Sequence, residues 1–225
     1  MLTPRLECIA KYVKADTAAD IGTDHAYVPV ELIKRGSAKR VIAADVREGP
    51  LRIAAANIEK HGLSEKIETR LGSGLSVLRP GEADTAIIAG MGGILISEII
   101  AADIETAADT LLVLQPMNSQ YELRKWLLKN NFKILWEDIE CEDHHVYNIM
   151  IAARGEAEPY KRDIDYHIPP MLYRHPKLRF LYEKKLREFL KIVRGLEKSE
   201  NCDNEKLEYY KNALEELKEI EYHVS

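Results

Sequence analysis

The chain has 225 residues, of which 46% are hydrophobic, and a formal net charge of −5 at pH 7. This length suffices for one buried core plus an appended segment, and the acidic balance argues against a general nucleic-acid binder. The sequence has no apolar run long enough to cross a membrane, no signal-peptide pattern, and three cysteines without metal-binding spacing. We therefore expect a cytoplasmic protein with no membrane span, no disulfide and no metal site.

The first 155 residues alternate strand and helix patterns in the way that a parallel α/β sheet requires. Strands are predicted over Thr17–Ile21, Arg40–Asp45, Lys66–Leu71, Ala83–Ala89 and Thr110–Leu114. Helices are predicted over Val30–Arg35, Pro50–His61 and Ser119–Asn130, with an apolar helix after Gly93.

Two more strands, Phe132–Ile139 and Val146–Ala153, follow one another too closely for a crossover helix. So short a link suits only an antiparallel pair. Five parallel units closed by an antiparallel pair predict the Rossmann-like seven-strand sheet of methyltransferases, in place of the six-strand dinucleotide fold.

The C-terminal part changes period. After a proline-rich connector at Gly155–Pro176, apolar residues recur at spacings of three and four from Leu178 to Leu196, and again from Leu207 to Leu217 after a polar break. This pattern predicts an antiparallel helical hairpin, and the alternative is one long helix that pairs with another subunit. We expect a methyltransferase domain over residues 1–157 and a helical domain over 158–225.

Charge is segregated between these two helices. Residues 160–198 contain 11 Lys and Arg against 5 Asp and Glu, whereas residues 199–225 contain 3 against 8. A basic segment on an acidic domain is a candidate surface for RNA phosphates, and a solvated helix face is the alternative. The candidate docking residues are Lys184, Lys185, Arg187, Lys191 and Arg194.

The segment Thr17–Pro29 carries the main functional signal. A strand that ends in Asp20-Ile21-Gly22 and leads into a helix is typical of nucleotide-like cofactor sites. A diphosphate loop needs a second glycine where this chain has Asp24, and two carboxylates would repel the phosphates. The loop instead suits S-adenosylmethionine, which carries a sulfonium and an ammonium group and no phosphate.

Other glycine and acidic residues also follow predicted strands, where ligands bind in such sheets. Asp45 ends the second strand and is placed to accept hydrogen bonds from the ribose hydroxyls. The expected cofactor-binding residues are Asp20, Gly22, Thr23, Asp24, His25, Asp45, Val46, Gly72, Ser73, Gly74, Gly90, Met91 and Gly92.

The acceptor side is expected after the fourth and fifth strands. Gly90–Gly93 leaves a floor with few side chains, and the Asn or Asp, prolines and aromatic residue typical of exocyclic-amine methylation are missing there. A ring nitrogen such as adenine N1 has a free lone pair and needs no strong base, only alignment and exclusion of water. Gln115 and Asn118 can pair with a base edge, and His25 and Tyr27 could face the base or pack in the core.

Several other aromatic and histidine side chains carry no predicted role in the site. We expect His144 and His145 to lie on the surface, and Trp126 and Trp136 to lie in the core.

Five segments together resemble the bacterial tRNA adenine-N1 methyltransferases that modify adenosine 22. They are Leu2–Leu6, Ala19–Tyr27, Gly72–Leu75, Ile88–Gly93 and Leu114–Pro116. The resemblance implies S-adenosylmethionine as methyl donor and tRNA as substrate. It also implies that Arg5, His25, Tyr27 and Gln115 lie near the acceptor base, with His25, Tyr27 and Gln115 positioning it. Ser73 departs from the family, which more often has an acid there.

Three other interpretations remain open from the residues alone. The sheet could serve a methyltransferase for ribosomal RNA or a small molecule, or the hairpin could belong to a non-catalytic RNA-binding or scaffolding protein. An NAD-dependent oxidoreductase ranks last because of Asp24 and the missing glycines. We expect a monomer, with dimerisation through the hairpin as the alternative.

Overall fold

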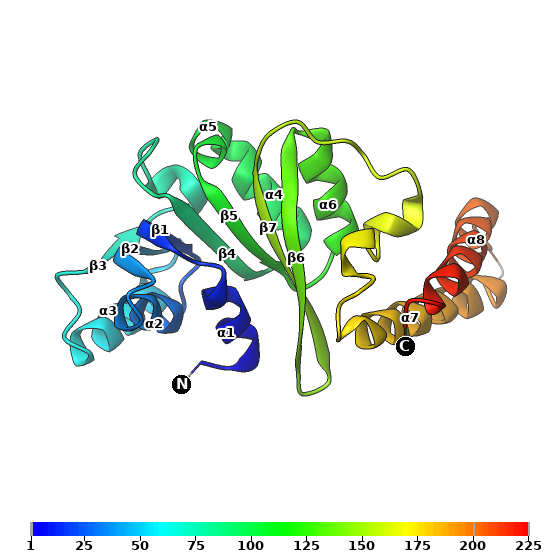
Figure 1. Ribbon diagram of the computed structural model, residues 1–225, viewed down its shortest axis with the longest axis horizontal. Helices are drawn as coiled ribbons and strands as arrows, with labels where there is room; N and C mark the ends of the chain where they lie inside the picture. Colours follow the sequence, from blue (N-terminus) through cyan, green and yellow to red (C-terminus); the bar gives the residue numbers. More distant parts are fainter. Residues whose placement is uncertain (1, 200, 225) are drawn as a thin grey trace.

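The computed structural model describes residues 2–199 and 201–224, and its strands form one seven-stranded sheet (Figure 1). The strands are β1 Ala15–Ile21, β2 Ala38–Asp45, β3 Ile67–Leu71, β4 Thr85–Met91, β5 Leu111–Pro116, β6 Phe132–Glu142 and β7 His145–Arg154. Their order is β3-β2-β1-β4-β5-β7-β6. The first five are parallel, and β7 is antiparallel to both β5 and β6. The predicted methyltransferase sheet is therefore confirmed.

The helices predicted between the strands are present, with small differences in their bounds and one additional helix. They are α1 Pro4–Lys11, α2 Tyr27–Lys34, α3 Glu48–Lys60, α4 Gly93–Ala102, α5 Ile104–Ala108, α6 Gln120–Lys129, α7 Leu178–Glu197 and α8 Asn204–Glu221. Helix α2 begins three residues before the predicted start, because Pro29 falls in its first turn, where a missing N–H costs nothing. The short helix α5 was not predicted.

Alternate residues of the buried strands face two separate cores. On β1, Ala18 packs in the cluster that contains Ile9 of α1 and Leu32 of α2. Its neighbour Ala19 packs in the other cluster, with Ile96 of α4. Because successive side chains point to opposite faces of a strand, and helices cover both faces, the buried parts of these strands are mostly apolar on both sides.

The C-terminal helices α7 and α8 pack side by side as a hairpin at one end of the molecule (Figure 1), which excludes the single long helix. The preceding segment, predicted only as a connector, is packed. It forms two short 3₁₀ turns, η2 Asp163–Tyr166 and η3 Pro170–Leu172, and Ile164 and Leu172 are buried in one cluster with the hairpin. The proline-rich composition of this segment indicated only a connector and carried no pattern that predicted its packing.

A fully buried ion pair contacts the segment that precedes the hairpin. The Arg124 guanidinium on α6 binds the Glu137 carboxylate on β6 at 2.6 Å and donates to the Tyr166 carbonyl at 2.8 Å. It therefore connects α6, the sheet and the segment that leads to the hairpin.

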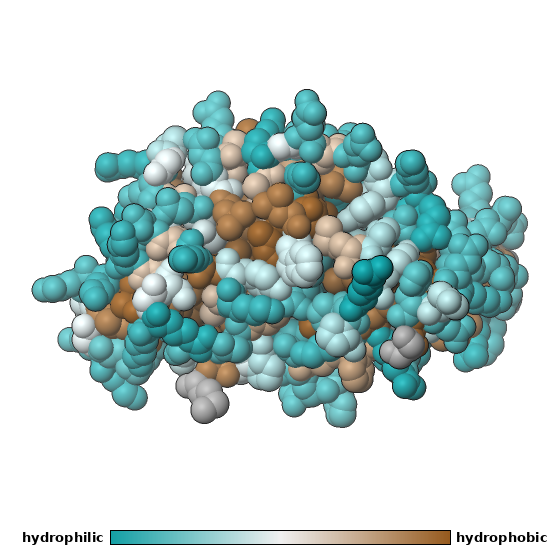
Figure 2. Space-filling model, in the orientation of Figure 1, coloured by the Kyte–Doolittle hydropathy of each residue, from teal (hydrophilic) through white to brown (hydrophobic). Residues whose placement is uncertain are grey.

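The prediction that Trp136 lies in the core is wrong. Trp136 is 52% exposed, because a bulge on the edge strand β6 between Ile134 and Trp136 turns the side chain outwards. Trp126 packs half-buried against the core, and His144 and His145 are exposed as predicted. In the orientation of Figure 1, the space-filling view in Figure 2 shows apolar side chains gathered over the middle of the molecule, with hydrophilic ones around them and over the hairpin. Among the described residues, no helix is long and apolar enough to cross a membrane.

Candidate cofactor and acceptor site

A cavity of about 560 Å³ opens at the carboxyl ends of the central strands β1, β2 and β4. Residues from all three strands and from the start of α1 line it. The predicted site residues among them are Arg5, Asp20, Gly22, Thr23, Asp24, His25, Tyr27, Asp45, Gly90 and Met91. The structure thus brings together residues that are up to 86 positions apart in the sequence.

The turn after β1 is held in an unusual backbone conformation. Gly22 has φ +82°, and its N–H donates to the Ala44 carbonyl of β2. Ala26, the residue that precedes α2, is left-handed at φ +53° although it is not glycine. Such a conformation costs free energy and is concentrated at functional sites. No local pattern in the sequence indicated the Ala26 conformation.

Asp20 is a buried carboxylate in the wall of this cavity. Burial raises its pKa to about 6. No ion pair joins it to a Lys, Arg or His within residues 2–199 and 201–224. An unpaired buried carboxylate favours a cationic ligand, which would supply the missing positive charge.

Asp45 lies at the end of β2, with its side chain 7% exposed. Its Oδ1 accepts a hydrogen bond of 2.7 Å from the Arg47 N–H. The Gly72 N–H donates to the Asp45 carbonyl, which places Gly72, Ser73 and Gly74 beside the cavity, although they do not line it. Val46 is 64% exposed and also lies outside the lining.

Gln115 was expected to contact the acceptor base, and the structure places it differently. Its side chain is fully buried and does not line the cavity. Its Oε1 accepts hydrogen bonds from the Arg5 guanidinium at 2.8 Å and from the Gly90 N–H at 3.2 Å. Gln115 therefore orients Arg5 and the loop after β4, and Arg5 is the group that reaches the cavity.

The loops after β4 and β5 are joined through their backbones. The Gly93 N–H donates to the Asn118 carbonyl, and the Met117 N–H donates to the Met91 carbonyl. A side chain at Gly93 would meet the Ser119 carbonyl at 2.3 Å, so only glycine allows this approach. Asn118 is exposed beside Gly92, and neither residue lines the cavity.

His25 and Tyr27 form an aromatic pair at the cavity. Their rings stack with centroids 5.1 Å apart, and Tyr27 is 53% exposed. His25 Nε2 lies 3.3 Å from the Asp24 carboxylate, and the His25 carbonyl accepts a hydrogen bond from Asn57 on α3. This partly exposed ring pair offers a flat surface on which a base can stack.

The expected RNA-docking residues on α7 divide into two groups. Arg187, Lys191 and Arg194 are exposed. Lys185 is buried and binds Glu188, and Lys184 donates to the Val146 carbonyl. These two lysines bind the protein itself because they lie towards β7 and the hairpin core, so the expectation that they contact phosphates does not fit their position.

The sequence analysis missed several residues of the cavity wall, among them Thr3, Leu6 and Arg47. Thr3 directly precedes α1 and Leu6 lies in its first turn, far from any glycine motif. Both belong to the segment Leu2–Leu6 that carries part of the family resemblance, but no local pattern indicated that they line a cavity.

Comparison with known proteins agrees with this geometry. Residues 2–150 match the family described as a methyltransferase domain. A tRNA (adenine(22)-N(1))-methyltransferase of Bacillus subtilis is 37% identical over 159 residues, which cover 70% of this chain and 67% of that protein.

Two solved structures are similar over nearly the whole chain. The B. subtilis m1A22 tRNA methyltransferase TrmK has a TM-score of 0.87 and 30% identity, with 98% of each chain covered. TrmK of M. capricolum in complex with S-adenosyl-homocysteine has a TM-score of 0.85 and 27% identity, with 100% of each chain covered. The chain belongs to the family of tRNA (adenine(22)-N(1))-methyltransferases.

Proposed function

We propose that this protein transfers the methyl group of S-adenosylmethionine to N1 of adenosine 22 in tRNA. The observation that carries the proposal is the cavity at the ends of β1, β2 and β4, in which the buried Asp20 has no cationic partner among the described residues. The similarity to tRNA (adenine(22)-N(1))-methyltransferases supplies the substrate class.

The residues of the cavity fit S-adenosylmethionine. Asp20 offers its carboxylate to the ammonium group, and Asp45 offers acceptors to the ribose hydroxyls. Asp24 adds a third negative charge at the mouth, where its side chain is 71% exposed. The carboxylates of Asp20, Asp24 and Asp45 would repel a diphosphate at this position. When bound, the cofactor supplies an electrophilic methyl carbon on its sulfonium.

The protein side chains orient the acceptor base and need not remove a proton. The adenine N1 lone pair forms the new bond to carbon as the carbon–sulfur bond breaks, and the base becomes cationic. We expect the His25–Tyr27 pair to stack on the base, and Arg5, held by Gln115, to fix its position. The Asp24 carboxylate favours the positive charge that develops on the base.

We further propose that residues 158–225 form the tRNA-docking domain. Arg187, Lys191 and Arg194 form an exposed basic surface on α7, suited to backbone phosphates. We expect the protein to act as a monomer in the cytoplasm.

One experiment tests the function. The purified protein is incubated with radiolabelled S-adenosylmethionine and unmodified tRNA transcripts, and the product nucleoside is identified and mapped. The proposal predicts N1-methyladenosine at position 22. Methyl transfer to ribosomal RNA or to another tRNA position would contradict it, and failure to bind the cofactor would favour a non-catalytic RNA-binding role.

A further inference from the structure

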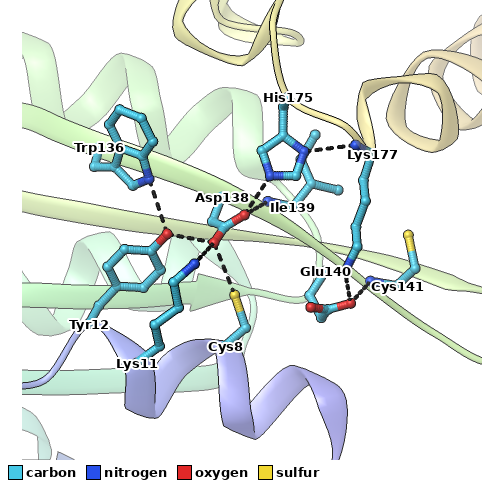
Figure 3. A network of polar contacts seen from close by, with 10 residues as sticks. All are labelled: Cys8, Lys11, Tyr12, Trp136, Asp138, Ile139, Glu140, Cys141, His175 and Lys177. Carbon is cyan, nitrogen blue, oxygen red and sulfur yellow. Dashed lines mark hydrogen bonds and ion pairs between the residues drawn. The ribbon is translucent and has the colours of Figure 1, made fainter.

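Asp138 on β6 is the centre of a polar network that joins three distant segments of the chain (Figure 3). Its Oδ2 accepts hydrogen bonds from Lys11 at 3.1 Å and from Tyr12. It also contacts the Cys8 thiol, at 3.4 Å. Its Oδ1 lies 2.6 Å from Nε2 of His175. The Asp138 side chain is only 10% exposed.

The tautomer of His175 follows from its second contact. Its Nδ1 accepts a hydrogen bond of 3.0 Å from the Lys177 N–H, so Nε2 carries a proton and donates to Asp138. Burial raises the pKa of Asp138, but hydrogen bonds from His175, Tyr12 and Lys11 lower it more, and its pKa lies well below the usual range. The carboxylate is therefore a permanent acceptor for all its partners.

The partners come from functionally different parts of the molecule. Cys8 and Lys11 lie on α1 and Tyr12 directly follows it, while the first turn of α1 presents Arg5 to the cavity. His175 and Lys177 immediately precede α7, the helix that carries the exposed basic surface. Lys177 is tied to β6 as well, through Glu140.

We propose that Asp138 is a positioning residue for tRNA methylation, which fixes the start of the docking helix α7 relative to α1 and the cofactor cavity. This inference rests on the proposed function. tRNA held by α7 must present adenosine 22 to a cavity lined by α1. A small displacement of α7 relative to α1 should therefore lower the rate of methyl transfer more than it lowers the affinity for tRNA. A misplacement of about 1 Å can lower a rate by about 100-fold.

Asp138→Asn in the full-length protein tests this role. Asparagine keeps the size of the side chain, but its NH₂ group cannot accept a hydrogen bond, so one partner of Asp138 meets a donor. We expect kcat at saturating tRNA to fall by about tenfold or more, while the Kd values for tRNA and S-adenosylmethionine change by less than about threefold. The stoichiometry of cofactor binding, measured by calorimetry, should stay at the wild-type level.

Asp84→Asn is the matched control. Asp84 also accepts a hydrogen bond, from the Thr17 N–H at 2.8 Å, but it directly precedes β4 and so lies at the end of the strands opposite the cavity. This variant should keep the wild-type kcat. Two variants of His175 test the hydrogen bond between His175 and Asp138 from the other side. His175→Gln retains a donor near the Nε2 position and should keep most of the activity. His175→Leu has no donor and should behave like Asp138→Asn.

Two results would overturn the proposal: an unchanged kcat in Asp138→Asn, or a kcat that falls only in proportion to the cofactor stoichiometry, which indicates a loss of folded protein. If the wild-type protein transfers no methyl group to tRNA, the proposed function fails. Hydrogen exchange then still tests whether Asp138 holds the segment before α7 in place. Asp138→Asn should then speed exchange at residues 173–178 and leave residues 20–27 unchanged. Equal exchange in both proteins would reject the positioning role.

Discussion

Different kinds of residue form the cofactor cavity and the joint, by which we mean Asp138 and the side chains that contact it. Backbone turns and side chains at the carboxyl ends of the neighbouring strands β1, β2 and β4 form much of the cavity wall, and the start of α1 completes it. The joint consists of longer polar side chains from α1, β6 and the segment before α7, and a single carboxylate links them (Figure 3). A local turn can therefore specify a binding site, whereas the placement of the C-terminal hairpin depends on contacts between distant segments.

Removal of Arg124 should give the largest effect and should separate stability from binding. Arg124→Ala leaves the Glu137 carboxylate buried without its partner, at a cost of about 3–5 kcal/mol in the free energy of unfolding. Chemical denaturation measures this loss. The double variant Arg124→Met with Glu137→Leu removes both charges and should regain most of the stability. If the double variant is as unstable as Arg124→Ala, the unpaired buried charge is not the cause of the lost stability.

Asp45→Ala should damage the cavity and leave the joint intact. The loss of a charged acceptor for the ribose hydroxyls should weaken S-adenosylmethionine binding by about 10- to 100-fold. Calorimetry measures the Kd, and the Kd for tRNA serves as the control because α7 is unaffected. An unchanged cofactor affinity would remove Asp45 from the site.

The pH dependence of cofactor binding should report Asp20. Its pKa is raised to about 6 by burial, so the carboxyl group is ionised above that pH and protonated below it. A cationic ligand prefers the ionised form, and affinity should therefore be constant above pH 6 and fall by about tenfold for each pH unit below it. Asp20→Asn should abolish this dependence, and a wild-type affinity that stays constant down to pH 5 would contradict the assignment.

The exposed basic residues of α7 should give the smallest effect. Arg187→Gln or Lys191→Gln each removes one charge and should weaken tRNA binding by a few fold, with a decrease of about 1 in the slope of log K against log salt. Binding titrations at several salt concentrations measure both values. Lys184→Gln is the comparison, since Lys184 donates to the Val146 carbonyl, and its salt slope should equal that of the wild type.

Much of the fold could be predicted because each strand and helix carries its own local pattern. The apolar runs, the glycine turns and the short link before β7 together indicated the methyltransferase sheet, and most residues predicted for the strand-end turns line one cavity. Asp20 and Asp45 were identifiable from their positions alone, since both end neighbouring strands.

The remaining features depend on tertiary contacts that no local pattern encodes. The exposure of Trp136 follows from a bulge, and the burial of Gln115 follows from its bonds to Arg5 and Gly90. Lys184 and Lys185 belonged to a basic run, but their position on the helix turns them towards the protein. The Asp138 network was not predicted because the side chains that contact Asp138 lie 37 to 130 residues from it in the sequence.

The most direct test of the account replaces the reacting atom. A tRNA transcript with 1-deazaadenosine at position 22 lacks the N1 lone pair but keeps the shape of the base. We predict that the wild-type protein binds this tRNA with unchanged affinity and transfers no methyl group to it. Methyl transfer to that transcript at the normal rate would show that another atom is the nucleophile and would contradict the account.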